Sequence, residues 1–234
     1  MGYAIVLFDV DGTLLDSSGA GRRALEVTFR ELHGIPDAFR GYDFTGRTDP
    51  GILHDAFQRH LGREPSLQEV RGACDRYLEH LESELARDPC GVRVLPGVRP
   101  LIEALRDAGT VAGLATGNLE RGARLKLGAA GLGGLLPFGG FGSDHRDRAA
   151  LTRLAADRGR AVLGAAVPGH RILVVGDSPL DIRAAHDAGL HVLSVLTGWT
   201  SGDALRRLGP EHLLEDLSDT AAVLRLIAGG GRTA

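Results

Sequence analysis

The sequence predicts an α/β protein in which a parallel sheet is interrupted after its first strand by a helical insertion. Three observations lead to this prediction. Residues 5–8 form a continuous apolar run of the kind found in buried parallel strands. Residues 18–90 carry only helical periodicity. From residue 94 onward, short apolar runs alternate with helical patterns, which is typical of a parallel sheet.

The change in periodicity sets the expected division of the chain. Residues 1–16 and 95–234 are predicted to form the core, and residues 17–94 are predicted to form a helical cap. The first strand can join the later strands only if the intervening helices lie outside the sheet. We therefore expect the cap to cover the carboxyl end of that strand, with a hinge at each of its two boundaries.

The expected cap consists of consecutive amphipathic helices. The first extends over about residues 18–33, and the second covers about residues 53–61. The third begins at Ser66, which is spaced to form a capping box with Glu69. Its apolar face continues to about residue 85, so it is the longest helix of the cap.

Apolar runs and glycines define the expected elements of the core, because the runs predict strands and the glycines mark where helices stop. Strands are expected over residues 111–115, 138–141, 171–175 and 191–195. Helices are expected over residues 98–108, 119–130, 149–158 and 220–228, and around Ile182. The glycine-rich tail that follows is expected to fray.

The composition argues against several classes of function. The 234 residues carry a net charge of −3, which gives no electrostatic footprint for nucleic acid or an anionic membrane. No apolar run approaches the roughly 18 residues of a bilayer span, and no secretory signal precedes the first strand, so we expect a cytoplasmic protein. Two cysteines, Cys74 and Cys90, are too few for a disulfide framework or a zinc site.

Polar residues follow the predicted strands at the points where those strands end. Asp9 and Asp11 follow the first strand and should point the same way, because strand side chains alternate. The segment 116–118, Thr-Gly-Asn, follows a second strand, and Asp177 and Asp181 follow a third. Since open α/β sheets bind ligands at the carboxyl edge, these residues are expected to form one site.

Each of these motifs also has a purely structural interpretation. Asp-x-Asp-Gly at residues 9–12 is a common solvated turn. Thr116 and Asp177 are residue types that cap helices. Their placement after successive strands favours a shared site over three unrelated turns.

The stretch from Phe8 to Ser17, Phe-Asp-Val-Asp-Gly-Thr-Leu-Leu-Asp-Ser, resembles the first motif of the haloacid dehalogenase-like hydrolase superfamily. Residues 116–118 and 176–181 resemble later motifs of that superfamily, and the match covers essentially the whole chain. The resemblance implies a Rossmann-like core with a helical cap similar to that of phosphoglycolate phosphatase-like members. It also implies a Mg²⁺-dependent phosphatase that hydrolyses a small phosphorylated metabolite through an aspartyl-phosphate.

The resemblance also implies roles for individual residues. Asp9 is the nucleophile and Asp11 the acid/base, two roles that carboxyl groups can fill in phosphoryl transfer. Mg²⁺, which prefers hard oxygen ligands, is expected to be held by Asp9, Asp11 and Asp177, the second of these through its backbone carbonyl, with Asp181 as a further ligand or a positioning group. The phosphoryl group is expected to contact Gly12, Thr13, Thr116, Gly117 and Asn118.

The third motif departs from the family pattern. The family usually places a lysine shortly before the helix that precedes the last acidic motif, but residues 142–148 contain none. Arg148 opens the following helix, and we favour it as the cation that holds the phosphoryl group. The alternative is Lys126, the only lysine of the chain, which can also be interpreted as a solvated helix residue.

Substrate choice is expected to depend on cap residues. Arg47 lies in the polar loop over residues 45–49, where it can contact an anionic group or remain a solvated surface arginine. Trp199 is either a core residue or a contact at the rim of the site. Two alternative functions stay open, a sugar-phosphate mutase of the same superfamily and a non-catalytic phospho-ligand binding or regulatory protein, the latter favoured by the altered third motif. We expect a small phosphorylated molecule as the only partner of a monomer or homodimer.

Overall fold

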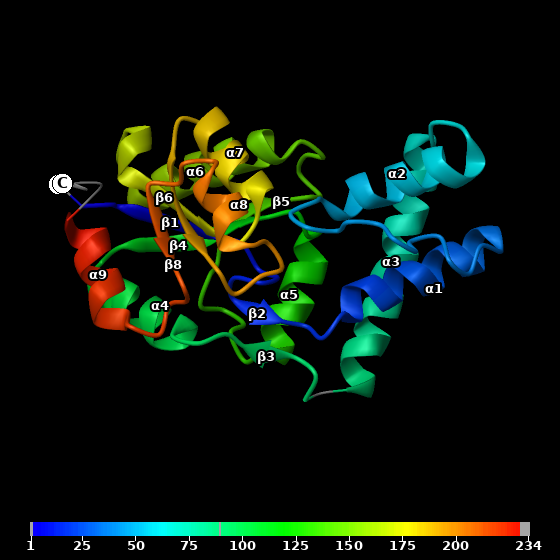
Figure 1. Ribbon diagram of the computed structural model, residues 1–234, viewed down its shortest axis with the longest axis horizontal. Helices are drawn as coiled ribbons and strands as arrows, with labels where there is room; N and C mark the ends of the chain where they lie inside the picture. The colour runs from blue at the N-terminus through cyan, green and yellow to red at the C-terminus, as the bar shows by residue number, and fades with distance from the viewer. Residues whose placement is uncertain (1, 89, 230–234) are drawn as a thin grey trace.

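The computed structural model describes residues 2–88 and 90–229 (Figure 1). Its central feature is a parallel sheet with the strand order β5-β4-β1-β6-β7-β8. The strands are β1 (Ile5–Phe8), β4 (Val111–Thr116), β5 (Gly139–Phe141), β6 (Ile172–Gly176), β7 (His191–Val195) and β8 (His212–Leu214). The predicted α/β fold is therefore confirmed, with the first strand lying between β4 and β6.

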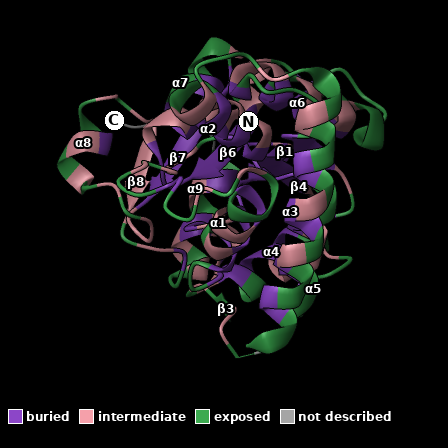
Figure 2. Ribbon diagram, turned by 90° about the vertical axis from the view of Figure 1, so that its right-hand side faces the viewer, coloured by how far each residue is buried: buried purple, intermediate pink, exposed green. Residues whose placement is uncertain are grey.

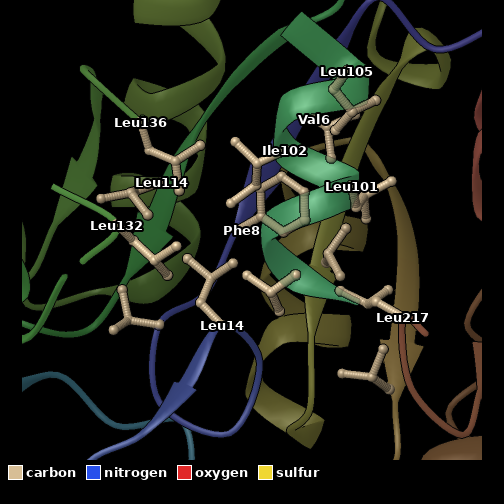
Figure 3. Close-up of a cluster of buried hydrophobic side chains, with 14 of the residues drawn as sticks. Val6, Phe8, Leu14, Leu101, Ile102, Leu105, Leu114, Leu132, Leu136 and Leu217 are labelled. Atoms are coloured by element: carbon tan, nitrogen blue, oxygen red, sulfur yellow. The ribbon is translucent and has the colours of Figure 1, made fainter. Parts of the chain in front are cut away.

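The two faces of the sheet are both covered by helices. Val6 and Phe8 of β1 pack on one face in a cluster with α4 (Val98–Asp107), α5 (Glu120–Ala129) and α9 (Thr220–Gly229), as the close-up in Figure 3 shows for α4. Ile5 and Leu7 pack on the other face with α6 (Arg148–Leu163), α7 (Pro179–Asp187) and α8 (Gly202–Arg206). Alternate side chains of one apolar run thus enter two cores, which is why β1 is buried along its whole length (Figure 2).

The helices after β1 form a group beside the sheet, on the right in Figure 1. They are α1 (Ala20–His33), α2 (Asp49–Leu61) and α3 (Leu67–Arg87), and they enclose an apolar cluster of their own. Phe29 is central to this cluster, since its ring centroid lies 5.8 Å from that of Phe39 and 5.6 Å from that of Phe57, both in edge-on arrangements. The predicted capping box of Ser66 and Glu69 begins α3.

A short antiparallel ribbon lies where the chain leaves the sheet and where it returns. It pairs β2 (Leu15–Asp16) with β3 (Arg93–Val94). The Arg93 guanidinium lies 2.6 Å from the Asp16 carboxylate, which joins the two crossing segments with an ion pair. The sequence did not predict this ribbon, because two-residue strands carry no periodic signal.

Other differences from the predicted elements concern short or terminal segments. Strand β8 and helix α8 were not predicted, and α6 continues to Leu163 rather than ending near residue 158. A 3₁₀ turn, Gly169–Arg171, precedes β6. The tail predicted to fray, residues 230–234, lies outside the described residues. Of the helices in the described part of the chain, none combines the length and apolar character needed to cross a bilayer.

Candidate active site

Three buried carboxylates converge at the carboxyl edge of the sheet. Asp9 follows β1 and Asp177 follows β6, and the parallel pairing of these strands places the two residues side by side. Asp181 lies in the first turn of α7, where it forms a capping box with Ser178. One carboxylate oxygen from each of the three acids lies within 4.8 Å of the others. The sequence-based expectation that residues 9 and 177 meet is thus matched by their positions.

One guanidinium faces this group of acids. Arg148 is the first residue of α6, and its Nη2 lies 2.9 Å from Asp9 Oδ2 and also pairs with Asp181. Burial raises the pKa of Asp9 to about 6, although Arg148 acts to lower it. Burial and the neighbouring carboxylates Asp181 and Asp9 raise the pKa of Asp177 well above its usual range. Three acids therefore share one cation, and the group retains uncompensated negative charge.

A second, separate ion pair involves Asp11. Its carboxylate lies 2.6 Å from Lys126 Nζ and accepts hydrogen bonds from Asn118 Nδ2 at 2.9 Å and Ser17 Oγ at 3.2 Å. Burial raises the pKa of Asp11, but the Lys126 ammonium and these hydrogen bonds outweigh it and hold the pKa below its ordinary value. Lys126 is 4% exposed, so it is not a solvated helix residue.

Asn118 connects this pair to the end of β4. Its Nδ2 also donates to Thr116 Oγ1 at 2.9 Å, and its Oδ1 accepts from Lys126 Nζ at 2.6 Å. Thr116 is fully buried at the last position of β4, and the Asn118 amide links its hydroxyl to the Asp11 carboxylate. The motif over residues 116–118 therefore does more than begin α5.

The turn after β1 packs directly on the acidic group. Gly12 adopts a φ of 80°, and a β-carbon there would lie 2.5 Å from Asp177 Oδ2, so only glycine fits. Thr13 Oγ1 donates a 3.1 Å hydrogen bond to Asp177 Oδ1. These two residues, predicted to contact a phosphoryl group, are seen here to position Asp177.

A cavity of about 590 Å³ lies between this floor and the helices α1, α2 and α3, which were predicted to form a cap. Asp9, Asp11, Asp177, Arg148 and Lys126 line it from the floor. Thr116 and Asp181 do not line the cavity and lie behind residues that do. The structure thus brings both candidate cations to the same cavity, each already paired with an acid.

Arg47 and Trp199 line the same cavity at its outer part. The Arg47 guanidinium lies 2.8 Å from Asp55 Oδ2 and over the Tyr42 ring, 5.2 Å from its centroid. Trp199 is 72% exposed, which identifies it as a residue of the rim and not of the core.

The sequence analysis missed a buried acid that joins the cap to the floor. Asp49, at the start of α2, donates its backbone N–H to Gly117 O at 2.8 Å, and its Oδ2 accepts from Leu119 N at 2.8 Å. Burial raises the pKa of Asp49 to about 6, although Lys126 acts to lower it. Its sequence context, Thr-Asp-Pro, is that of an ordinary helix start, so nothing local indicates the contact.

Arg148 makes a second link to the same cap loop. Its Nη1 donates to Gly46 O at 2.6 Å, while Thr48 Oγ1 donates to Arg146 O at 3.1 Å. The role of Thr197, in the loop after β7, was also missed: its Oγ1 donates to Gly12 O at 2.6 Å. Both loops are fixed by contacts between residues distant in the sequence.

Comparison with known proteins adds to this geometry. A family model described as haloacid dehalogenase-like hydrolase matches residues 3–189. Phosphoglycolate phosphatase from Synechococcus elongatus is 28% identical over 215 residues, covering 92% of this chain and 93% of that protein. N-acetylmuramic acid 6-phosphate phosphatase from Pseudomonas aeruginosa is 31% identical over 207 residues, covering 83% and 82%. The structure of CbbY from Rhodobacter sphaeroides in complex with phosphate matches with a TM-score of 0.70 at 22% identity, over 93% of this chain and 96% of that chain, and this likeness concerns the fold.

Proposed function

The chain belongs to the haloacid dehalogenase-like hydrolase family and is a phosphatase of phosphorylated small molecules, and from that premise we propose that it works through an aspartyl-phosphate formed on Asp9, with Mg²⁺ as cofactor. The observation that carries the proposal is the convergence of Asp9, Asp177 and Asp181 beside Arg148 at the end of adjacent strands. Residues 17–94 are proposed to act as the cap over this floor.

The acidic group fits a divalent cation. Its three buried carboxylates face one guanidinium, and carboxylate oxygens are the ligands that Mg²⁺ prefers. Asp9, Asp177 and the backbone carbonyl of Asp11 would hold the ion, while Asp181, already bonded to Ser178 and Arg148, would act as a further ligand or position the others. Bound there, the ion would neutralise charge on the phosphoryl oxygens.

Asp9 and Asp11, the two acids that follow β1, have different roles in the proposed reaction. Asp9 attacks the phosphorus, the bond to the leaving oxygen breaks, and Asp11 gives its proton to that oxygen. Asp11 then takes a proton from water, whose oxygen attacks the phosphorus and releases Asp9 and inorganic phosphate. The contact with Lys126 keeps the Asp11 carboxylate ionised, the form that can accept a proton from water, and an anionic phosphoryl group beside Lys126 would raise the pKa of Asp11 toward the role of acid.

Several groups are proposed to bind the phosphoryl oxygens. The Thr116 hydroxyl and the backbone N–H groups of Gly117 and Asn118 lie at the start of the segment that leads into α5. Gly12 and Thr13 lie on the opposite side, against Asp177. We propose Arg148 as the principal cation, because it contacts the nucleophile itself, whereas Lys126 contacts the acid/base. Arg47 is proposed to contact the substrate from the cap.

The test measures turnover of p-nitrophenyl phosphate with and without Mg²⁺, followed by acid quench and mass spectrometry of the peptide that contains Asp9. We expect Mg²⁺-dependent release of inorganic phosphate and one phosphoryl group on Asp9. A mutase would instead convert a hexose phosphate to its isomer without comparable phosphate release. Binding of phosphate without turnover, and without a phosphorylated peptide, would contradict the proposal and favour a non-catalytic protein.

A further inference from the structure

The only tryptophan of the chain, Trp199, lies at the mouth of the active-site cavity. Its side chain is 72% exposed, although tryptophan is normally well covered in a folded protein. A single exposed aromatic residue on an open surface would require no explanation. Trp199 differs because it lines a cavity whose floor carries the nucleophile and because its loop is fixed.

Two contacts fix the Trp199 loop to the catalytic floor. Thr197 Oγ1 donates a 2.6 Å hydrogen bond to Gly12 O. Gly198 packs so closely on the acidic group that a β-carbon would lie 1.7 Å from Asp177 Oδ2. The residue next to Gly198 is therefore held at a defined distance from the site of chemistry, which gives a preorganised surface rather than a mobile one.

The cap contributes further aromatic surface to the same cavity. Tyr42 and Phe44 both line it, with ring centroids 5.0 Å apart. The Arg47 guanidinium lies over Tyr42, and the Arg22 guanidinium lies over Phe44 at 5.8 Å from its centroid. Flat groups thus form the cap side of the cavity as well as the rim.

The charges of these two arginines are compensated. Arg47 pairs with Asp55 at 2.8 Å, and Arg22 pairs with Glu26 at 2.9 Å. Two acids also line the cavity: Asp16, which pairs with Arg93 at 2.6 Å, and Asp43, which accepts a hydrogen bond from Thr45 N at 3.0 Å. A leaving group that carries a carboxylate would meet arginines that already have acidic partners, whereas an uncharged ring would meet the exposed ring of Trp199.

We propose that the leaving group of the substrate carries an uncharged planar aromatic ring that stacks on Trp199, as the base of a nucleoside 5′-monophosphate would. This inference depends on the proposed function, since it names the substrate class of that same site. The cavity of about 590 Å³ is large enough, because pockets of roughly 300–1,000 Å³ accommodate ligands the size of drugs. The phosphoryl group would lie at the floor and the ring at the rim.

The first test compares substrates that differ only in the ring. Uridine and adenosine 5′-monophosphates are compared with ribose 5-phosphate, which has the same kind of phosphoester and no base, and with 2-phosphoglycolate. We expect kcat/KM for at least one nucleotide to exceed that for ribose 5-phosphate by tenfold or more. Base–aromatic stacking, measured by alanine substitution, is of about this size. In Trp199→Ala this ratio should fall about tenfold, and Trp199→Phe should retain most of it.

A matched control removes an exposed apolar side chain elsewhere. Leu67 is 81% exposed at the start of α3 and does not line the cavity, so Leu67→Ala should leave the substrate ratio unchanged. A wild-type enzyme that hydrolyses ribose 5-phosphate or 2-phosphoglycolate as well as the nucleotides would overturn the inference. The same holds if Trp199→Ala keeps the wild-type ratio.

The second test does not depend on turnover. In the Asp9→Asn variant, the fluorescence of Trp199 reports stacking directly, because no other tryptophan contributes. We expect saturable quenching by a nucleotide and none by ribose 5-phosphate at the same concentration. Absence of turnover on every phosphoester, with quenching intact, would sink the proposed function alone. Turnover with neither fluorescence quenching nor a preference for substrates that carry a ring would overturn the proposed substrate class and leave the proposed phosphatase function intact.

Discussion

The floor of the candidate active site contains two buried ion pairs, Arg148 with Asp9 and Lys126 with Asp11. Each joins one cation to an acid that follows β1, but the two differ in the balance of the charges around them. On one side, Arg148 faces three carboxylates, and the pKa values of Asp9 and Asp177 are raised. On the other side, Lys126 forms an ion pair with Asp11, and the pKa of Asp11 is lowered. The first group therefore has more carboxylates than cations, whereas in the second one ammonium group pairs with one carboxylate.

This difference indicates a division of labour between the two sides. A group of acids with raised pKa values gains stability from any added cation, which suits a metal site and the binding of a transferring phosphoryl group through that metal. A balanced pair changes its protonation when one partner is drawn away, which suits acid/base chemistry. Substitutions that act on one side and leave the other intact can therefore test the division.

Removal of the proposed nucleophile should have the largest effect. Asp9→Asn replaces a carboxylate that can attack phosphorus with an amide of the same shape that cannot. We expect turnover of p-nitrophenyl phosphate to fall by at least about 10⁴-fold, the scale seen when a covalent nucleophile is removed. Circular dichroism should show an unchanged fold, since the amide oxygen of the variant can still accept the hydrogen bonds of the site. Activity near the wild-type level would remove Asp9 from this role.

The two cations should differ in the size of their effects. Arg148→Ala should lower kcat about 10³-fold, because it removes the cation that contacts the nucleophile. Lys126→Ala should cost less, roughly 10- to 100-fold, because it acts through Asp11 as a general acid/base. The pH–rate profile separates the two, since only the loss of Lys126 should shift the limb that reports Asp11 upward. The reverse order of effects would make Lys126 the phosphoryl clamp.

The fold and the floor of the site follow from local features of the sequence. The apolar runs of β1, β4 and β6 predicted buried strands of one parallel sheet, and the acids and hydroxyls at their ends predicted one shared site. Strand β8 escaped prediction because its residues are only partly buried and number three. The ribbon of β2 and β3 escaped because its pairing depends on the return of the chain after the cap.

The contacts between segments distant in the sequence were not predictable in the same way. Asp49 binds Gly117 and Leu119, about 70 positions away, and Thr197 binds Gly12, which lies 185 positions away. Neither contact leaves a periodic or spacing signal, because each depends on how two loops meet after folding. The charge of Lys126 was visible in the sequence, but its burial against Asp11 depends on the same tertiary packing.

Binding of the metal should appear as a gain in stability on the acidic side only. At a Mg²⁺ concentration 100 times its Kd, linkage predicts about 2.7 kcal/mol, or a rise in Tm of roughly 5–10 °C for a chain of this length. Asp177→Asn should remove most of this rise, and a chelator should reverse it in the wild type. Asp203→Asn is the control, since that side chain is 82% exposed on the surface. A Tm that does not change when Mg²⁺ is added would contradict the proposed metal site.

The last prediction concerns Asp49, the acid that joins α2 to the side of the floor that carries Lys126. Its pKa is raised from 3.8 to about 6, so its contribution to stability is full below pH 3.8 and is lost as the pH rises through 6. The corresponding free energy is at most roughly 3 kcal/mol. An asparagine side chain at this position can still accept the hydrogen bond of Leu119 but does not titrate. Asp49→Asn should therefore gain stability relative to the wild type as the pH rises from 4 to 7.

Urea unfolding of both proteins at several pH values, without Mg²⁺, measures this difference, and Asp219→Asn provides the control. Asp219 is an exposed acid at the start of α9, and its carboxylate accepts a hydrogen bond from Ala222 N at 2.9 Å. Asp219→Asn therefore also removes the charge of an acid at a helix start, but from a side chain that is not buried. A constant difference between Asp49→Asn and wild type across this range would mean that Asp49 is ionised in the folded protein throughout. In that case Lys126 would be shared by two ionised carboxylates, Asp11 and Asp49, over the whole range and not only above about pH 6.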